Sequence, residues 1–348
     1  MSGGLLCKGG LLMRTGSSLA VGLGVNETGA FFTPGTWEHD IGSLLGMWLV
    51  TAVSAISLAT FGSAVLFWRY YWAPTYEQWT RKSNPKFPGP EKVRDEIVQM
   101  LKGMVIGALC PAISVWLAGR GSFTKGYCGM PDDVSLAQQV GGFFFVWFAS
   151  DFCEFFYHWL GHVVRPFWNV HKHHHVFFNP TPFAVVADEF FDQFNRALPM
   201  LIFPILLPLN IDVAFLTFSV FFYGYGLYLH WGYELDAISA HHPVLNTAFQ
   251  HYAHHAKSVF GKPYHCGFMF KIWDQLFGAV WAGPCFCAKC EREAGRRTRE
   301  QFAKIVKPDY SVLLRPSFWL QKGVWTGITS TESNDLVGKD YHPLKEKQ

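Results

Sequence analysis

Histidine is concentrated in one part of this 348-residue chain. Of the 15 histidines, only His39 and His342 lie outside the interval from His158 to His265. Three short motifs occur within it: HWLGH at residues 158–162, HKHHH at residues 171–175 and HYAHH at residues 251–255. Imidazole nitrogens are ligands for zinc and iron, so the chemistry that these motifs favour is metal coordination.

The spacing within each motif suits a metal site built on helices. Residues three and four positions apart share one face of a helix, and the motifs place their histidines at these intervals. Eight ligands exceed the four of one tetrahedral zinc ion, and burying so many imidazoles beside apolar segments requires a shared partner. The sequence therefore predicts a dinuclear centre. Its candidate ligands are His158, His162, His171, His174, His175, His251, His254 and His255.

Other residues of this interval are predicted to complete or support the centre. His230 follows an apolar segment that would return to the same membrane face, so it is predicted as a ninth ligand. His173 would point about 100° away from His174 on a helix, which favours a supporting role. Surface or supporting roles are also predicted for His241, His242 and His265. Carboxylates orient ligating rings in metal sites. The candidates for this role are Asp151, Glu154, Asp188, Asp192 and Asp274.

The composition indicates a membrane protein. Only 16% of the residues are charged, against about a quarter in an ordinary soluble domain. The net charge of +3 is small and the basic residues form no long stripe, so nucleic acid is not a predicted partner. Apolar runs predict spans at about residues 41–68, 98–118 and 138–160, because about 20 residues cross a bilayer. Two apolar arms, 197–209 and 211–229, are predicted to form a hairpin that enters and leaves on the cytosolic side, since the first arm is short and proline-rich.

Basic residues give the predicted orientation. The loop after the first span is rich in Lys and Arg, which favours a cytosolic position for this loop and for the histidine motifs. The predicted fold is an all-α, polytopic membrane helical bundle with a cytosolic histidine-rich di-metal helical cap. Its segments are a flexible lumenal tail (1–40), an N-terminal transmembrane region (41–137), a catalytic region (138–282) and a cytosolic C-terminal tail (283–348). Asn26 is a glycosylation acceptor in the lumenal tail whose modification the sequence leaves open.

The segment CFCAKC contains a single CxxC pair. Its thiols could take part in a zinc site if a fourth ligand came from elsewhere in the chain. One CxxC lacks the second pair that is typical of such sites, so free cytosolic thiols are favoured. The residues concerned are Cys285, Cys287 and Cys290.

Together the three motifs resemble the histidine boxes of the fatty acid hydroxylase superfamily of membrane di-iron oxygenases. Within it, the chain is most similar to the sterol C5 desaturases, also called lathosterol oxidases. HKHHHVFFNPTPFA resembles their second box and its proline-rich sequel, and RALPMLIFPILLPL and KIWDQLFGAVW resemble later segments. The resemblance covers roughly Asp151 to Trp281. VVADEFFDQF lacks a histidine that the family has there, and GKPYHCG replaces an Asn-Tyr-rich run, so both could reshape the substrate pocket.

The resemblance implies that the eight candidate histidines and His230 bind two iron ions, with no further catalytic residues. It implies O2 as co-substrate, abstraction of hydrogen from an unactivated C–H bond, and electrons from cytochrome b5 and its NAD(P)H-dependent reductase. It also implies an endoplasmic reticulum membrane protein that introduces a double bond into a sterol ring.

Two alternatives to the sterol desaturase remain open. A lipid hydroxylase of the same superfamily, such as a sterol C4-methyl oxidase or a fatty acyl or sphingolipid hydroxylase, would use the same ligands, because substrate placement decides between the reactions. A non-catalytic zinc transporter would call for ionisable groups near the bilayer midplane. The imidazoles instead gather at the ends of the predicted spans, which disfavours transport.

Overall fold

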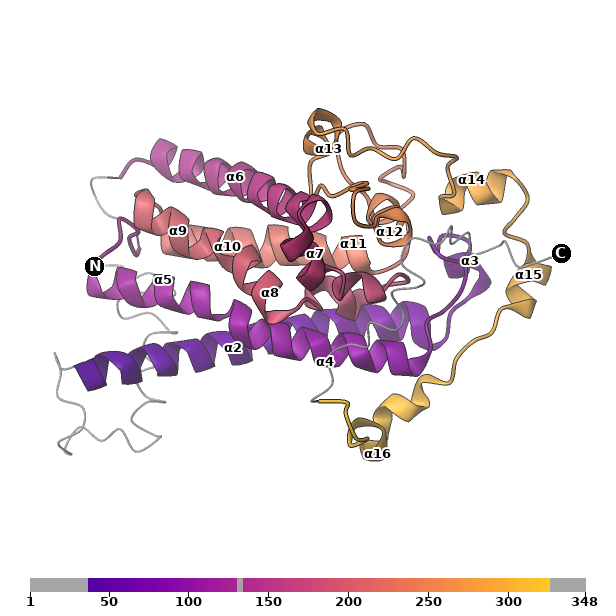
Figure 1. Cartoon of the computed structure of the whole chain (residues 1–348), viewed down its shortest axis with the longest axis horizontal. Helices are drawn as coiled ribbons and strands as arrows, with labels where there is room; N and C mark the ends of the chain where they lie inside the picture. Colours follow the sequence, from indigo (N-terminus) through magenta and orange to yellow (C-terminus); the bar gives the residue numbers. More distant parts are fainter. Residues whose placement is uncertain (1–36, 130–133, 326–348) are drawn as a thin grey trace. The chain divides into compact units, whose positions relative to one another are not determined.

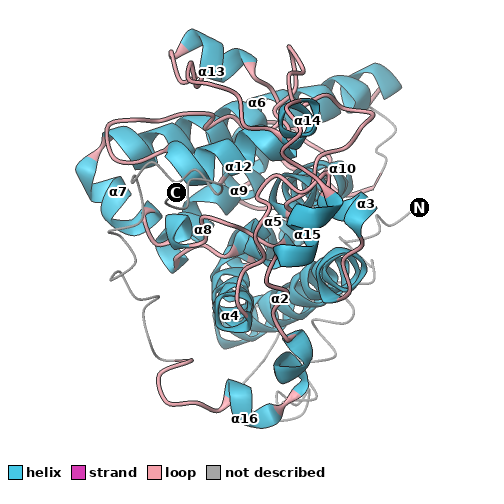
Figure 2. Ribbon diagram, turned by 90° about the vertical axis from the view of Figure 1, so that its right-hand side faces the viewer, coloured by secondary structure: helices cyan, strands magenta, loops and turns pink. Residues whose placement is uncertain are grey.

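The computed structural model describes residues 37–129 and 134–325. Within these ranges the chain forms α-helices and short 3-10 and π-helical turns joined by loops, with no β-strand (Figure 2). The predicted all-α fold class is confirmed. Asn26 and most of the predicted N-terminal tail lie outside the described residues.

The chain divides into two compact units, each considered by itself. The first consists of Met1–Leu58, Met104–Ser150 and Gln193–Phe222. The second consists of Ala59–Gly103, Asp151–Asp192 and Tyr223–Gln348. All the histidine motifs fall in the second unit.

Two predicted spans match segments that are long and apolar enough to cross a membrane. Ser43–Trp72 contains most of α2 (Trp37–Phe67) and the π-helical turn η1 (Trp68–Trp72). Pro90–Arg120 joins α4 (Pro90–Gly107) to α5 (Leu109–Arg120). The helix is interrupted at Ala108 because Pro111 has no N–H to donate to the carbonyl of Gly107.

Helix α6 (Leu136–Val163) covers the third predicted span and has 28 residues. It is not among the segments of the described chain that are both long and apolar enough to cross a membrane. Gln138, Gln139 and Asp151 interrupt its apolar sequence. Its C-terminal end carries the first histidine motif.

The two arms of the predicted hairpin differ in length. The first arm forms α9 (Pro199–Leu206), and the second is an unbroken helix made of α10 (Ile211–Leu216), η4 (Thr217–Tyr223) and α11 (Gly224–His230). This second arm is long and apolar enough to cross a membrane. Both α9 and α10 lie beside α5 (Figure 1).

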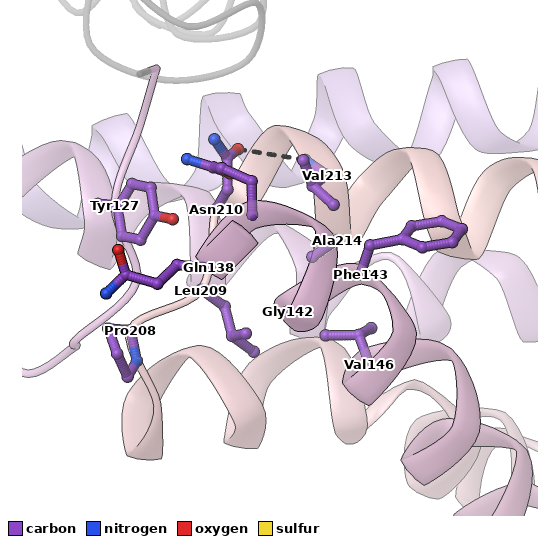
Figure 3. A pocket seen from close by; sticks show the side chains of 11 residues that line it. Tyr127, Gln138, Gly142, Phe143, Val146, Pro208, Leu209, Asn210, Val213 and Ala214 are labelled. Atoms are coloured by element: carbon purple, nitrogen blue, oxygen red, sulfur yellow. Dashed lines mark hydrogen bonds between the residues drawn. The ribbon is translucent and has the colours of Figure 1, made fainter. Parts of the chain in front are cut away.

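The tip of the hairpin is fixed to the loop that follows α5. The N–H of Gly126 donates to Pro204 O at 2.8 Å, and the N–H of Ile211 donates to Tyr127 O at 3.0 Å. Asn210 accepts a hydrogen bond from Val213 N at 3.2 Å and donates one to Gly129 O at 2.7 Å. Tyr127, Asn210 and Val213 are among the residues that line a small pocket at the tip (Figure 3). The hairpin therefore reaches the same end of the unit as α5.

The second unit consists mainly of shorter helices. Helix α8 (Phe190–Ala197) leads from it into the first unit. Its other short elements are α3 (Tyr76–Trp79), α7 (Arg165–His171), η2 (His174–Val176), η3 (Pro182–Val186), α12 (Ala248–Lys257), α13 (Ile272–Leu276), α14 (Ala288–Glu293), α15 (Arg299–Lys304), η5 (Tyr310–Leu314) and α16 (Pro316–Trp319).

The segment predicted as a C-terminal tail packs against this unit as far as it is described. Tyr310 is 3% exposed, and its hydroxyl donates to Pro88 O at 2.7 Å. Arg94 donates from Nη1 to Phe318 O at 3.2 Å. The boundary predicted at residue 283 therefore falls inside a folded unit, because the aromatic side chains of this segment supply apolar surface to bury.

The proline-rich segment after the second histidine motif is anchored to α2 and α4. Ser63 Oγ donates to Pro182 O at 2.9 Å. The carboxylate of Glu96 accepts from Thr181 N at 3.1 Å and from the Thr181 hydroxyl. Both Glu96 and Thr181 are buried, at 1% and 0% exposed. These contacts fix the start of η3.

Replacing Glu96 by alanine should lower the stability of the second unit. The change leaves the buried N–H and O–H of Thr181 without their acceptor, and each such loss costs about 1–3 kcal/mol. Thermal unfolding in detergent, followed by tryptophan fluorescence, should show a lower Tm for Glu96→Ala than for the control Glu91→Ala, at an exposed position of the same helix. Equal Tm values for the two variants would contradict the anchoring role.

Candidate metal centre

The two histidines of the first motif, His158 and His162, lie one turn apart on α6. His158 Nδ1 is 3.0 Å from Cys266 O, and His162 Nδ1 is 3.3 Å from Val259 O. A carbonyl oxygen only accepts hydrogen bonds, so these contacts assign the ring proton to Nδ1 in both residues. Each Nε2 is then left with a lone pair for a metal.

The second motif is not the single helix that its spacing predicted. Helix α7 ends at His171, and the 3-10 turn η2 starts at His174. Pro180 and Pro182 follow closely and cannot continue a helix. The tighter turn still brings His175 back to His171, with their Nε2 atoms 3.2 Å apart.

The third motif lies on one helix, as predicted. α12 starts with a capping box in which Gln250 Oε1 accepts from Thr247 N at 2.8 Å and Thr247 Oγ1 accepts from Gln250 N. His251, His254 and His255 are all buried. Helix α11 lies beside α12 and ends at His230 (Figure 1).

The nine predicted ligands meet in two groups. In each group, one ring nitrogen from every residue lies within 4.8 Å of the others. The first group is His158, His162, His171, His175 and His254. The second group is His174, His230, His251 and His255. The structure thus brings together all nine residues, and His173 is in neither group.

Both HxxHH motifs contribute to both groups. His171 and His175 fall in the first group and His174 in the second; on α12, His251 and His255 fall in the second and His254 in the first. On a helix, positions i and i+4 point about 40° apart, and position i+3 points about 60° to the other side of i. On α12 the motif therefore directs two rings to one site and the third ring to its neighbour, and the turn from α7 into η2 produces the same division in the second motif.

Distances within each group match ligands of a single metal. His175 Nε2 lies 3.1 Å from the Nε2 atoms of both His162 and His254. In the second group, His251 Nε2 lies 2.8 Å from His230 Nε2 and 3.1 Å from that of His255. Two nitrogens bound at right angles to one metal at about 2.1 Å would be about 3.0 Å apart. The donor set therefore fits a pair of metal ions.

Burial favours the neutral form of several imidazoles in this centre. It is the main cause that lowers the pKa of His175, His254 and His255 well below the usual value. The neighbouring imidazoles lower these pKa values further. Neutral rings are the form that binds metal.

Two of the five candidate carboxylates contact predicted ligands. Asp192 Oδ2 lies 3.4 Å from His171 Nδ1, and its other oxygen accepts from the Tyr157 hydroxyl at 2.6 Å. Asp188 Oδ1 lies 3.1 Å from His174 Nδ1. Both carboxylates belong to VVADEFFDQF, the segment in which the chain departs from the family it resembles.

Asp151 and Asp274 instead hold the loop behind the first motif. Asp151 accepts from Met269 N at 2.7 Å and Trp273 Nε1 at 2.8 Å. Asp274 accepts from Gly267 N at 3.1 Å, next to the Cys266 carbonyl that His158 contacts. Asp151 and Asp274 therefore fix the backbone around Cys266, whose carbonyl contacts His158. Glu154 lies on α6 one turn before His158.

The remaining histidines have other surroundings. His242 Nδ1 accepts from Leu245 N at 2.9 Å within a turn, and His265 Nε2 accepts from Trp281 N at 3.4 Å. His241 is exposed, as the sequence analysis allowed, but it has a further set of neighbours that was not predicted. It lies beside the thiols of CFCAKC, which are distant from it in sequence. No local spacing signal connects them.

Fold and site define a helical membrane protein whose residues 143–279 match the family model described as fatty acid hydroxylase. This match and the relatives below agree with the prediction of an oxidoreductase enzyme. They also confirm the predicted resemblance to the sterol C5 desaturases. No solved structure matches the chain.

The relatives carry sterol desaturase names. The chain is 28% identical over 226 residues to a Delta(7)-sterol 5(6)-desaturase of Gibberella zeae, covering 64% of this chain and 60% of the relative. It is 26% identical over 259 residues to the lathosterol oxidase of Mus musculus, covering 72% and 81%. A shorter match to a Delta(7)-sterol 5(6)-desaturase of Leptosphaeria maculans, 34% identical, covers 39% and 35%. The chain thus aligns with less than two thirds of each of the two fungal proteins.

Proposed function

We propose that this protein is a membrane di-iron sterol desaturase of the C5 type, which uses O2 to introduce a double bond into a sterol ring. The observation that carries the proposal is the meeting of nine histidines in two adjoining groups of ligand spacing. The names of the relatives support the sterol as substrate.

Two iron ions held by these groups would supply O2 activation and the removal of hydrogen from an unactivated C–H bond. The contribution of the chain is to hold and orient the ligands. Backbone carbonyls, including Ala187 O beside His174, and the carboxylate of Asp192 favour ring protons on Nδ1. Burial limits the access of water to the imidazoles and favours the neutral form of His175, His254 and His255.

The electrons for this reaction would come from cytochrome b5 and its NAD(P)H-dependent reductase. The proposal places the protein in the endoplasmic reticulum membrane with the histidine groups on the cytosolic side, and residues 138–282 as the catalytic region. Exposed Lys304 and Lys307 offer positive charge for an acidic electron donor.

A lipid hydroxylase is the second candidate function. The family model that matches residues 143–279 is that of fatty acid hydroxylases, so the same centre is compatible with oxygen insertion into a sterol or an acyl chain. Desaturation and hydroxylation differ in where the substrate carbon sits relative to the metal pair. The products, not the ligand set, therefore distinguish them.

Sterol profiles of yeast that lacks its own sterol C5 desaturase test the proposal. Expression of the wild-type chain should restore 5,7-diene sterols, measured by gas chromatography with mass spectrometry. His174→Ala should abolish them, and His242→Ala, outside the centre, should not. An unchanged profile with an expressed and iron-loaded protein would overturn the desaturase proposal, and hydroxylated lipids in the same cells would then favour the second candidate.

A further inference from the structure

A second set of metal-ligand residues lies outside the histidine groups. His241 Nε2 is 3.4 Å from Cys290 Sγ and 3.6 Å from the Sγ atoms of both Cys285 and Cys287. The four ligand atoms all lie within 4.8 Å of one another. The fourth ligand that the single CxxC lacked in the sequence is therefore supplied by His241.

We propose that these four residues bind a structural zinc ion. With Zn–S distances of about 2.3 Å and a Zn–N distance of about 2.0 Å, a tetrahedral site places the nitrogen about 3.5 Å from each sulfur. All three nitrogen–sulfur distances in the structure agree with this value. One tetrahedron accounts for the whole cluster, with no ligand left over and no open position.

The chemistry of the ligands favours zinc over iron of the kind proposed for the histidine groups. Three thiolates and one imidazole form a soft, closed set typical of structural zinc sites. None of the three cysteines forms a disulfide. Backbone N–H groups also point at the sulfurs, from Cys287 to Cys285 Sγ at 3.5 Å and from Cys290 to Cys287 Sγ at 3.4 Å. Such N–H groups orient and stabilise metal-bound thiolates.

The position of the cluster indicates what the zinc would stabilise. Phe286, within the cysteine segment, packs on Phe249 and Tyr252 of α12, with ring centroids 5.0 and 5.9 Å apart. Cys287 belongs to the same buried cluster. The opposite face of α12 carries the third histidine motif. The zinc would join residues 285–290 to His241 in the loop before α12, and so hold Phe286 against the back of the helix that presents ligands to both histidine groups.

Metal analysis of the purified full-length protein in detergent tests this proposal. We expect about one zinc per chain in addition to iron, and a zinc K-edge spectrum dominated by sulfur neighbours at about 2.3 Å. Cys290→Ser and His241→Ala should lose the zinc while the iron content is retained. The matched control is Cys153→Ser, a half-buried thiol outside the cluster, which should retain both metals. Cys290 and His241 are less buried than Cys287, so these variants are less prone to misfolding.

The readouts separate this site from zinc that enters the histidine groups. His174→Ala should leave the sulfur-bound zinc in place, so a failed desaturase assay would not affect the result. A zinc spectrum without sulfur neighbours would overturn the proposal. So would zinc content unchanged by Cys290→Ser and His241→Ala, or a disulfide among the three cysteines in peptides alkylated before reduction.

Discussion

Replacing His175 by alanine should abolish sterol oxidation and remove iron from the first group only. His175 Nε2 lies within 3.2 Å of the Nε2 atoms of His162, His171 and His254. Its replacement removes the nitrogen that is nearest to the other ligand atoms of the first group. The second group shares none of its ligands with the first. The iron content of the purified variant should therefore fall by half.

His255→Ala is the counterpart of this variant in the second group. It should also abolish turnover and halve the iron content, because the proposed reaction requires both ions. His242→Ala should retain activity and full iron content. A remaining single ferric ion should give a high-spin EPR signal that a coupled ferric pair does not. Full turnover and unchanged iron in His175→Ala would contradict the site assignment.

The histidines that gather in the two groups could be selected from the sequence because their signal is local. Intervals of three and four residues identify a helix face without any knowledge of the tertiary fold. The assignment to groups is not local. His254 joins His175, while its neighbour His255 joins His174, and this pairing depends on how α12 packs against the turn after α7. A sequence pattern fixes the face of a helix but not its partner.

The partners of His241 and of the carboxylates could not be predicted from a local sequence pattern either. His241 and Cys285 are 44 residues apart and share no pattern. For Asp151, the helical spacing to His158 suggested a contact, but its oxygens are taken by backbone and indole N–H groups of the loop around Met269. Asp188 precedes α8 and Asp192 lies in its first turn, and neither is at a helical spacing from its histidine. Their partners follow from the bend of the chain at Pro180 and Pro182.

Asp192→Asn should weaken iron binding at the first group while leaving the second unchanged. The substitution preserves the shape of the side chain but removes the negative charge next to His171 Nδ1, so the ring becomes a poorer metal ligand. Loss of such an outer carboxylate typically costs about 10–100-fold in metal affinity. Asp188→Asn should have the corresponding effect on the second group through His174. Competition with an iron chelator measures both affinities.

The control for this comparison is Glu189→Gln, which removes a carboxylate of the same segment that contacts neither His171 nor His174 in the described contacts. A general electrostatic effect of the segment would make all three variants alike. A specific orienting role predicts that only Asp188→Asn and Asp192→Asn weaken binding, each at a different ion. Equal affinities in Asp192→Asn and Glu189→Gln would show that the Tyr157–Asp192–His171 chain does not orient the ring. In that case the packing of α6 and α7 alone would position His171.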